Sequence, residues 1–526
     1  MSVSGQKTSG ADGLKMLVLV ALWLGATAWM RPLMLPDEGR YASVALEMLR
    51  SGDWLTPTLN GLPFFHKPPL FYWISGAAMM ALGPTELAAR AASLVGATLG
   101  ALSLYLFARR WCDAASARQA LLVLAVQPLF FLGAQFANLD MLVAGCITAT
   151  VLALAHAALS FEAGQPDRRV LWLAYALAAL GVLAKGLIGC VIPALVIGLW
   201  LMARRRWRSL LALLSPPGAV LFLLIAAPWF VLMQQRFDGF LHYFFVVQHF
   251  QRFAAGGFNN VQPFWFYPVA LAACSLPCLA WARLTRGYWR AEGALREVRL
   301  LMVLTVVCVV AFFSLPQSKL IGYVLPAVPA LAWWMADASA PAARSRKSQW
   351  WWHASLACSA LIGLAAVLAL VLDQHYKHYL HGSARRMALA LKARHQPGQP
   401  VVMVKQYAYD LAFYAGLDQP VWVADDWSRP DIARHDNWRR ELVDAGEFNP
   451  ALARRLLIEP SALPAALCRA GVAWVIGHAQ APQPWPWLTR AEPVFSDRGQ
   501  TLWRVDMRQS GMPTCAGTPN DGSANK

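Results

Sequence analysis

Charged side chains that could perform chemistry open the segment 36–69 (PDEGRYASVALEMLRSGDWLTPTLNGLPFFHKPP). Asp37 and Glu38 are followed at short spacing by Arg40, and Lys67 lies near the end of the segment. Asp37 could be a helix N-cap, and Glu38 a first-turn carboxylate favoured by the helix dipole. The functional interpretation is a general base or metal ligand in the two carboxylates, and phosphate binding by Arg40 and Lys67.

A second acidic candidate, Asp140, stands in the stretch QFANLDMLV. It could cap a helix, but Asn138 could fill that position equally well, which would leave Asp140 for chemistry. Lys185 in LAKG and Lys319 in SKLIGYVLP lie at the ends of apolar stretches, where a lysine either snorkels to the membrane interface or binds an anion. Tyr323 follows Lys319 by four residues, which would place both on one helical face.

Histidines and a further arginine are weaker candidates. His66 directly precedes Lys67 and could join Glu38 and His249 as ligands of one divalent metal ion, although their spacing matches no metal motif. A single histidine is more often a structural residue than a ligand. Arg252, three residues after His249, is a candidate for binding phosphate.

The amino-acid composition indicates what kind of protein positions these residues. Of 526 residues, 57% are hydrophobic and only 14% are charged, against about 25% charged in a soluble domain. This excludes a water-soluble enzyme, a disordered chain and a small disulfide-rich protein, and predicts a polytopic α-helical membrane protein. The net charge of +17 would suggest nucleic acid in a soluble protein, but cytoplasmic loops of membrane proteins collect Lys and Arg. No nucleic-acid partner is therefore expected.

Stretches of about 20 apolar residues predict the membrane spans. Segment 68–83 is ambiguous, but only if it lies in the interface do the Lys and Arg clusters between later spans all fall on the cytoplasmic side. We therefore expect about 11–13 transmembrane helices, with the loop 36–84 and the C-terminal segment on the outer side. The predicted spans are 14–35, 85–108, 117–136, 139–160, 170–184, 187–203, 209–233, 263–282, 298–315, 321–338 and 350–372.

The chain is expected to divide into a transmembrane domain, 1–372, and an outer α/β domain, 373–526, whose end, 510–526, looks disordered. The α/β prediction rests on strand-like VVMV (401–404), PVWVA (420–424), AWVIG (473–477) and a final TLWRVDM, with helix-like YDLAFYAG between the first two. Cys468 and Cys515, the two cysteines of this domain, are expected to pair.

Within the loop 36–84, Tyr41, Val44, Ala45 and Met48 fall at helical spacing, with polar residues on the other face. This pattern predicts an amphipathic helix that lies on the membrane surface and ends at Gly52. Nearly every ionisable residue near membrane depth is thus expected at an outer span end or in an outer loop. A secondary transporter would place its polar site near the midplane, whereas an enzyme acting on lipid headgroups would place it here. The pattern favours the enzyme, and a lipid or sugar transporter is the alternative from another class.

The run PDEGRYASVALEMLRSGDWLTPTLNGLPFFHKPPLFYW resembles the first outer loop of the bacterial GT-C glycosyltransferases. The most similar branch is that of the lipid A aminoarabinose transferases, which is related to the protein O-mannosyltransferases. NLDMLV, LAKG, QHFQRF and SKLIGYVLP resemble later motifs of the family in the same order, and the resemblance covers about the first 340 residues. The C-terminal part resembles the outer domain of the family only in size, position and strand pattern.

The resemblance implies an enzyme of the inner membrane that takes a sugar from undecaprenyl phosphate and transfers it, with inversion, on the periplasmic side. In the aminoarabinose branch the acceptor is lipid A of lipopolysaccharide. It implies that Asp37 is the principal catalytic carboxylate and that Asp140 is a second one. The residues expected to bind substrate or phosphate are Arg40, Lys67, Tyr323, Lys185, Lys319 and Arg252.

One position departs from the aminoarabinose branch. Its members usually have Glu before the loop lysine, whereas this chain has Phe65-His66-Lys67-Pro68. That Glu is associated with a metal in the family, so one divalent metal ion is kept open as a cofactor. The sugar is then aminoarabinose or another, such as a hexosamine, and the acceptor is lipid A or a related envelope glycan. Protein O-glycosylation is the alternative in the same class.

Overall fold

The structure is a computed structural model that describes residues 10–251, 260–282, 288, 291–341, 345–376, 382–432, 437–478 and 485–509. Side chains are described over the same ranges except at 10–12, 249–251 and 374–376. Arg252, the side chain of His249 and the expected disordered end, 510–526, lie outside the described residues. Cys468 is disulfide-bonded, but Cys515 also lies outside them, so the pairing of these two cysteines stays a prediction.

The chain divides into two compact units. The first contains Met1–Arg31 and Phe65–Leu372, and the second contains Pro32–Phe64 and Asp373–Lys526. The apolar pattern predicted that all of 1–372 belongs to the transmembrane domain. The structure instead groups residues 32–64 with the C-terminal part, because the first helix and hairpin of this segment bind to it.

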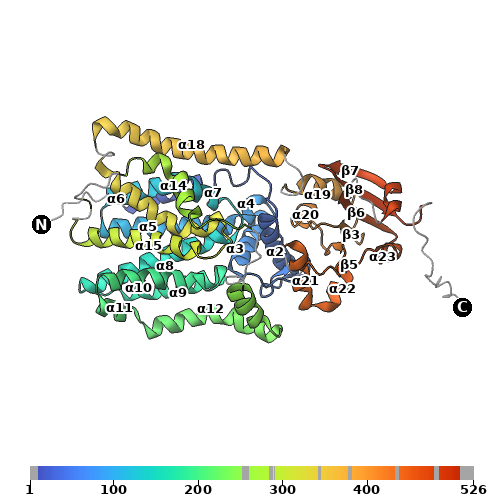
Figure 1. Ribbon diagram of the computed structural model, residues 1–526, viewed down its shortest axis with the longest axis horizontal. Helices are drawn as coiled ribbons and strands as arrows, with labels where there is room; N and C mark the ends of the chain where they lie inside the picture. Colours follow the sequence, from blue (N-terminus) through green and yellow to red (C-terminus); the bar gives the residue numbers. More distant parts are fainter. Residues whose placement is uncertain are drawn as a thin grey trace. The chain divides into compact units, whose positions relative to one another are not determined.

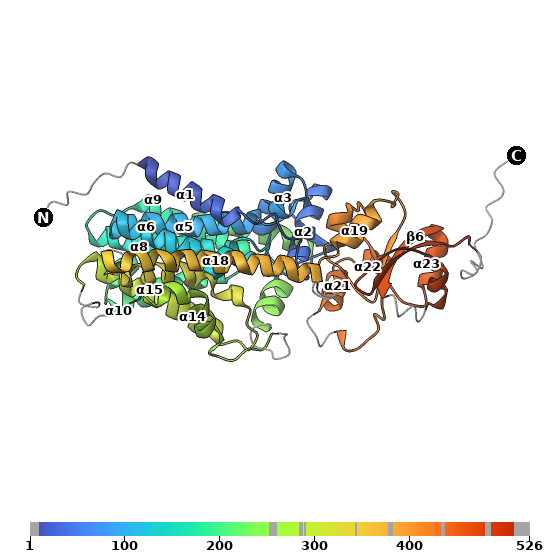
Figure 2. The ribbon, with the colours of Figure 1, turned by 90° about the horizontal axis from the view of Figure 1, so that it is seen from above.

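The first unit is a bundle of helices. Its described helices are α1 (Gly10–Gly25), α3 (Leu70–Leu82), α4 (Glu86–Ala89), α5 (Ala91–Trp111), α6 (Ala114–Val126), α7 (Pro128–Ala134), α8 (Leu139–Glu162), α9 (Arg168–Lys185), α10 (Ile188–Ala203), α11 (Trp207–Leu213), α12 (Pro216–Arg236), the π-helix η1 (His242–Gln251), α14 (Phe266–Leu279), α15 (Ala294–Ser314), the 3-10 helix η3 (Ile321–Ala327), α16 (Val328–Ala338) and α18 (Arg346–Tyr376). α8 is central and packs against α5, α9 and α10, whereas α18 runs along the outside of the bundle (Figures 1 and 2).

Five of the described helices are long and apolar enough to cross a membrane: α5, α8, α12, α15 and α18. α6 and α7 meet the same criterion as a pair, and α1, α3, α10 and α14 are apolar but shorter. The chain is thus a multi-pass membrane protein. Each predicted span contains a helix, but full-length spanning helices are fewer than the expected 11–13 among the described residues. With 13 residues, α3 rises only about 20 Å, which is too short for a hydrocarbon core of about 30 Å.

The predicted span 117–136 consists of two helices, α6 and α7, that are bent by 68° relative to each other. Gln127 between them has an extended backbone, and its side-chain carbonyl accepts a hydrogen bond from the N–H of Phe130 at 2.8 Å. Pro128 occupies the first turn of α7, where its missing N–H is not needed. An N-cap followed by proline therefore starts a new helix inside the apolar run.

The second unit contains a six-stranded mixed sheet of order β5-β4-β3-β6-β8-β7. Four strands are parallel, and β7 and β8 extend the sheet as an antiparallel pair. Its elements after α18 are α19 (Arg385–Lys392), β3 (Val401–Val404), α20 (Leu411–Ala415), β4 (Trp422–Ala424), α21 (Trp438–Glu447), α22 (Pro450–Leu456), β5 (Leu457–Ile458), α23 (Leu463–Ala470), β6 (Val472–His478), η5 (Pro486–Arg490), β7 (Glu492–Asp497) and β8 (Gln500–Asp506). The predicted strands correspond to β3, β4, β6 and β8, whereas β5 and β7 were not predicted.

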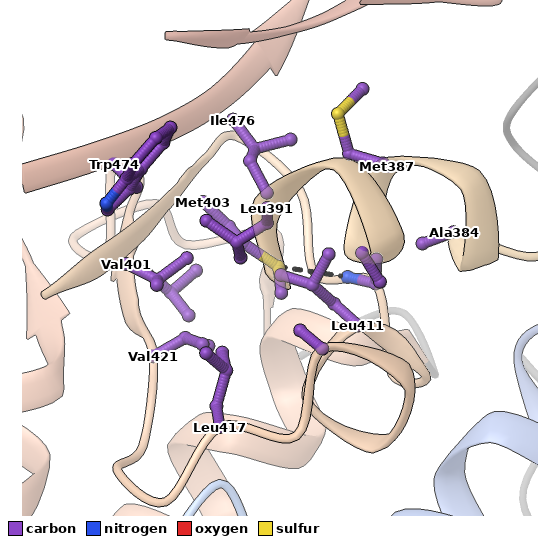
Figure 3. Packing of buried hydrophobic residues seen from close by; sticks show 14 of the residues in the cluster. Ala384, Met387, Leu391, Val401, Met403, Leu411, Leu417, Val421, Trp474 and Ile476 are labelled. Carbon is purple, nitrogen blue, oxygen red and sulfur yellow. Dashed lines mark hydrogen bonds between the residues drawn. The ribbon is translucent and has the colours of Figure 1, made fainter. Parts of the chain in front are cut away.

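Alternating residues of β3 enter two hydrophobic cores, one on each face of the sheet. Val401 and Met403 belong to the first core, and Val402 and Val404 to the second. In the first core, Met403 packs with Leu391 of α19 among further apolar side chains from α20 and β6 (Figure 3). A strand buried on both faces is typical of parallel sheets, and it explains the uninterrupted run VVMV.

The helix α2 (Asp37–Ser51) binds to the C-terminal part through its polar face. The hydroxyl of Ser43 donates to the carbonyl of Tyr409 at 2.6 Å, and the guanidinium of Arg50 donates to the carbonyl of Leu417 at 2.5 Å. The helix predicted in this segment is present and ends at Gly52 as expected. Its polar side chains bind groups of the same chain, and its place on the membrane surface stays a prediction.

A short hairpin, β1 (Thr58–Leu59) and β2 (Leu62–Pro63), continues this attachment. Its turn residues Asn60 and Gly61 both have positive φ, 54° and 74°, as the Asn-Gly pair of a tight hairpin requires. The carboxylate of Glu47 on α2 accepts hydrogen bonds from both turn N–H groups and from the hydroxyl of Thr58. The amide of Asn60 exchanges two hydrogen bonds with the backbone of Val421, at 2.8 and 2.9 Å. These bonds fasten residues 32–64 to the sheet.

Candidate functional site

Asp140 is oriented by Asn138, the N-cap of α8. The side-chain oxygen of Asn138 accepts a hydrogen bond from the N–H of Asp140 at 3.0 Å, and its amide donates to Oδ2 of Asp140 at 3.2 Å. The alternative left open in the sequence, that Asp140 itself caps the helix, is therefore excluded. Its carboxylate is only 7% exposed and points to neighbouring elements instead.

Lys185 and Tyr323 complete a cluster with Asp140. Lys185 is the last residue of α9, which packs beside α8, and its Nζ forms an ion pair with Oδ1 of Asp140. The same Nζ lies 4.3 Å from the centre of the Tyr323 ring, a distance at which a cation is attracted by the ring face. The structure thus brings together three candidates that come from three separate motifs.

Gly322 allows η3 to approach the start of α8. A Cβ built at Gly322 would overlap the carboxylate of Asp140. The next residue is Tyr323, so the closeness of the backbone at Gly322 is what brings the ring to Lys185. A side chain at this position would force the carboxylate or η3 to move.

Buried hydrogen bonds fix the loop that leads into α8. The hydroxyl of Ser93 on α5 donates to the carbonyls of Phe136 and Asn138, at 2.6 and 3.1 Å. The guanidinium of Arg31, which is 3% exposed, donates to the carbonyl of Gln135 at 2.7 Å. Hydrogen bonds from a charged donor are worth about 1.5–3 kcal/mol each. The position of Asp140 is therefore determined by packing beyond its own helix.

Lys319 does not join this cluster. It precedes η3, and its Nζ donates to the carbonyls of Gln262, Pro316 and Gln317 at 2.9, 2.5 and 3.5 Å. The expectation that Lys319 and Tyr323 share a helical face is wrong, because η3 begins only at Ile321. Lys319 is 4% exposed and organises its own loop, which argues against a role in phosphate binding.

Asp37 and Arg40 lie on the first turn of α2, in the second unit. Pro36 occupies the N-cap position, so Asp37 is the first helical residue and not the cap. Its side chain is 36% exposed, and its Oδ1 lies 3.6 Å from a guanidinium nitrogen of Arg40. The pair combines a half-exposed carboxylate with a largely buried cation, which is a suitable arrangement for a base whose orientation is controlled.

Two residues of the C-terminal part contact Arg40 from the other side. Oε1 of Glu441 lies 3.2 Å from the guanidinium, and the hydroxyl of Tyr409 donates to Oε2 of Glu441 at 2.6 Å. The ring of Tyr409 lies 5.0 Å from the guanidinium carbon. Burial acts to lower the pKa of Arg40, but Glu441, Tyr409 and Asp37 together raise it, so Arg40 is charged. Burial and Glu441 likewise raise the pKa of Tyr409, which therefore keeps its proton.

Of the metal candidates, Glu38 belongs to the second unit and His66 to the first, and the side chain of His249 lies outside the described residues. Oε2 of Glu38 accepts a hydrogen bond from the N–H of Met34 at 3.0 Å, and Glu38 is fully buried. His66 is 6% exposed, with its ring 6.1 Å from that of Tyr243. Within the described ranges, no group of three or more His, Cys, Asp or Glu residues could hold an ion.

Lys67 lies in the bend before Pro68 and Pro69, which lead into α3 of the first unit. Among the candidates, Asp140, Lys185 and Tyr323 form a cluster in the first unit, and Asp37 and Arg40 form a pair in the second. Chemically, the cluster and the pair offer carboxylates, cations and a phenol, the groups that position a sugar phosphate and neutralise a leaving phosphate.

Sequence reasoning missed several residues that shape the cluster and the pair. Ser93 and Gly322 gave no signal, because their roles depend on contacts between distant segments. Glu441 and Tyr409 lie in the part of the chain where the family resemblance is weakest. Asn138 was not missed, because the sequence already named it as an alternative to Asp140 for the cap position.

Known proteins resemble this chain in sequence over the segment that contains Asp140 and Lys185. The family model of dolichyl-phosphate-mannose-protein mannosyltransferases matches residues 66–232. The undecaprenyl phosphate-alpha-4-amino-4-deoxy-L-arabinose arabinosyl transferase 1 of Sodalis glossinidius is 34% identical over 373 residues, 67% of this chain and 64% of the relative. The corresponding transferase of Pseudomonas aeruginosa is 33% identical over 313 residues, 58% of this chain and 55% of the relative. The chain is thus similar in sequence to transferases named for polyprenyl-phosphate-linked sugars.

Solved structures show that the chain shares a known membrane-protein fold beyond the segments matched in sequence. ArnT from Cupriavidus metallidurans, in a crystal structure bound to undecaprenyl phosphate, superposes with a TM-score of 0.74 at 23% identity, covering 97% of this chain and 100% of that one. Its apo structure gives the same TM-score at 21% identity, covering 94% and 98%. In sequence, the matches span less than two thirds of the length of the curated relatives.

Proposed function

We propose that this protein is an inverting glycosyltransferase that moves aminoarabinose, or another sugar such as a hexosamine, from undecaprenyl phosphate to lipid A. The alternative acceptor is a related envelope glycan. The proposal rests on the matching family model and on the names of its relatives, which are undecaprenyl phosphate-aminoarabinose transferases. The reaction takes place on the periplasmic side of the inner membrane, where the C-terminal part also lies.

The observation that supports this function most directly is the cluster at the start of α8. A buried carboxylate, Asp140, is paired with Lys185 beneath Tyr323, and a capping residue orients it. A pair of opposite charges at low exposure is costly unless its geometry is well satisfied. A chain that only had to span the membrane would gain nothing from keeping it.

The proposed chemistry needs positioning more than covalent help. An acceptor oxygen attacks the anomeric carbon, the bond from that carbon to the phosphate oxygen breaks, and its electron pair leaves with undecaprenyl phosphate. Arg40, Lys67 and Tyr323 would neutralise and hold the phosphates. A lipid A phosphate is already a nucleophile, so Asp37 would orient it or the sugar, whereas a hydroxyl acceptor would need Asp37 as general base.

Asp140 would be the second acidic residue, and its ion pair gives Lys185 a role in orienting it. Lys185 would thereby act on the substrate through Asp140. If a divalent metal ion takes part, His66, Glu38 and His249 are the residues that would hold it, and no step depends on it.

A second candidate is protein O-glycosylation with the same kind of donor. One observation favours it: the family model that matches residues 66–232 is that of protein mannosyltransferases. Both candidates use a polyprenyl-phosphate sugar, so they differ only in where the sugar ends. A transport function, in contrast, would move the lipid without forming a new glycosidic bond.

The test uses the full chain in proteoliposomes with undecaprenyl phosphate-aminoarabinose, lipid A and total envelope protein, analysed by mass spectrometry. We expect the sugar on lipid A, and a loss of at least about 100-fold in rate for Asp37→Asn and for Asp140→Asn. Asp113→Asn is the matched control, because Asp113 caps α6 and asparagine caps equally well.

Sugar found on protein but not on lipid A would refute lipid A glycosylation and support protein O-glycosylation. Lipid movement without any glycosylated product would refute both. Wild-type rates for Asp37→Asn would remove Asp37 from the mechanism. Undecaprenyl phosphate-linked glucosamine as competing donor decides between the two sugars.

A further inference from the structure

Arg40 on α2 forms an ion pair with Glu441, which belongs to the C-terminal part of the second unit. Its guanidinium lies between two carboxylates, 3.2 Å from Glu441 and 3.6 Å from Asp37. The two acids differ in exposure: the side chain of Asp37 is 36% exposed, and that of Glu441 only 5%. Glu441 thus holds the buried side of Arg40, and Asp37 stands on the side open to solvent.

Glu441 is itself fixed in place. Both of its oxygens are used, Oε1 by Arg40 and Oε2 by the hydroxyl of Tyr409. It lies in the first turn of α21, whose N-cap Asn437 accepts hydrogen bonds from two backbone N–H groups. The helix dipole favours a carboxylate at the start of a helix, and this adds to the contact of Glu441 with Arg40.

Small residues bring α2 close enough for this contact. A Cβ at Gly39 would lie 3.1 Å from the backbone nitrogen and Cβ of Asp410, and it would overlap Leu35. One turn later, Ser43 donates to the carbonyl of Tyr409. The backbone of α2 is therefore held against residues 409–410 on both sides of Arg40 in the sequence, which places the guanidinium beside Glu441.

The charges explain what Glu441 does for the proposed reaction. With Asp37 and Glu441 ionised, the three groups carry a net charge of −1, and Glu441 takes up part of the attraction that Arg40 would otherwise direct to Asp37. Without Glu441, the guanidinium would turn to Asp37 as its remaining anion and form a closer pair. The carboxylate would then be turned away from the substrate, while the cation would attract a phosphate more strongly.

We propose that Glu441 and Tyr409 are positioning residues that hold the Arg40 guanidinium, and through it the Asp37 carboxylate, in the orientation needed for sugar transfer. The proposal rests on the proposed function, because it requires Asp37 and Arg40 to act in the reaction. It assigns to the C-terminal part a direct influence on the reaction.

The first test compares Glu441→Gln with the wild type in proteoliposomes, using undecaprenyl phosphate-aminoarabinose and lipid A. We expect kcat to fall about tenfold and the donor KM to fall at least about twofold, because an uncompensated Arg40 binds phosphate more strongly. The matched control is Asp444→Asn on the same helix, whose carboxylate pairs with Arg440 at 3.7 Å. It should leave both constants unchanged. A Glu441→Gln enzyme with unchanged donor KM and unchanged kcat per folded molecule would overturn the proposal.

A double-mutant cycle tests whether Glu441 acts through Arg40. In an Arg40→Ala background, Glu441→Gln should cause no further fall in kcat, since the residue that it positions is gone. A purely structural role would instead produce a further loss of the same size in that background. That additive result would overturn the proposal.

Two conservative variants keep the test valid if Glu441→Gln folds poorly. Tyr409→Phe removes one hydroxyl and should lower kcat by less than Glu441→Gln, and Glu441→Asp should restore part of the activity. Wild-type activity in Tyr409→Phe together with none in Glu441→Asp would contradict the assignment. Asp37→Asn distinguishes failure of the proposed function from failure of this inference. If Asp37→Asn stays active, the proposed function fails. If Asp37→Asn is inactive but the double-mutant cycle is additive, only the positioning role of Glu441 and Tyr409 fails.

Discussion

The behaviour of Asp140 depends on the residues around it more than on its own position. Lys185 compensates its charge, and Asn138 binds one of its oxygens while capping α8. A carboxylate at 7% exposure would be costly to ionise without such partners. These partners hold the Asp140 carboxylate in one orientation at the start of an apolar helix.

Replacing Asn138 by alanine should therefore have two effects. The lost cap should cost about 1 kcal/mol of stability, and the carboxylate of Asp140 should lose its orientation, lowering the transfer rate about tenfold or more. Thermal unfolding in detergent and the proteoliposome assay measure the two effects. The control is Ser215→Ala, which removes the cap of α12 but no contact with a candidate residue. Equal activities of the two variants would show that the cap has no part in the reaction.

Gly322→Ala tests the close approach of η3. The added methyl group would overlap the Asp140 carboxylate, so we expect the ion pair with Lys185 to shift and the rate to fall about tenfold. Gly198→Ala in α10 serves as the comparison, because a Cβ there meets nothing within 4 Å. It should keep full activity and be slightly more stable, since alanine favours a helix over glycine. Full activity in Gly322→Ala would mean that the carboxylate can move without consequence.

At the scale of elements, the carboxylate of Glu47 joins α2 to the β1–β2 hairpin, and its pKa is raised. Glu47 is buried, and burial raises its pKa from 4.5 to about 7, although hydrogen bonds from Gly61, Thr58 and Asn60 act in the opposite direction. Burial likewise raises the pKa of Asp410, beside Gly39, from 3.8 to about 7. Both groups lie where residues 32–64 meet the rest of their unit.

These shifts give the second unit a stability that depends on pH. Because the folded-state pKa lies above the unfolded value, the folded protein binds more protons between about pH 4 and pH 7, so stability falls as pH rises through this window and is constant above it. Glu47 contributes at most about 3 kcal/mol to this pH-dependent part of the free energy of unfolding. We expect the unfolding temperature of the full chain to be higher at pH 5 than at pH 8, and Glu47→Gln to reduce that difference. An unchanged difference in Glu47→Gln would contradict the assignment to Glu47.

At the scale of the whole molecule, apolar runs and alternating strands were predictable because they are local patterns. The runs ending at 160 and 404 became α8 and β3 as expected. The grouping of 32–64 with the C-terminal part was not predictable, because it depends on contacts such as that of Asn60 with Val421 across 361 residues. The candidates Asp37 and Asp140 were found from residue type and resemblance. Glu441 was missed because nothing local distinguishes a partner of Arg40 from any surface glutamate.

This grouping predicts how a nicked protein behaves. A protease site inserted between residues 376 and 382 would cut the chain between α18 and the C-terminal part, yet residues 32–64 would still hold the latter through Asn60 and Arg50. After cleavage in detergent, we expect the two fragments to elute together on size exclusion. Cleavage of an Asn60→Ala, Arg50→Ala variant should release the C-terminal fragment more readily, because three hydrogen bonds between the fragments are gone. Complete separation of the wild-type fragments would show that the covalent link, not the contacts of α2 and the hairpin, keeps the unit together.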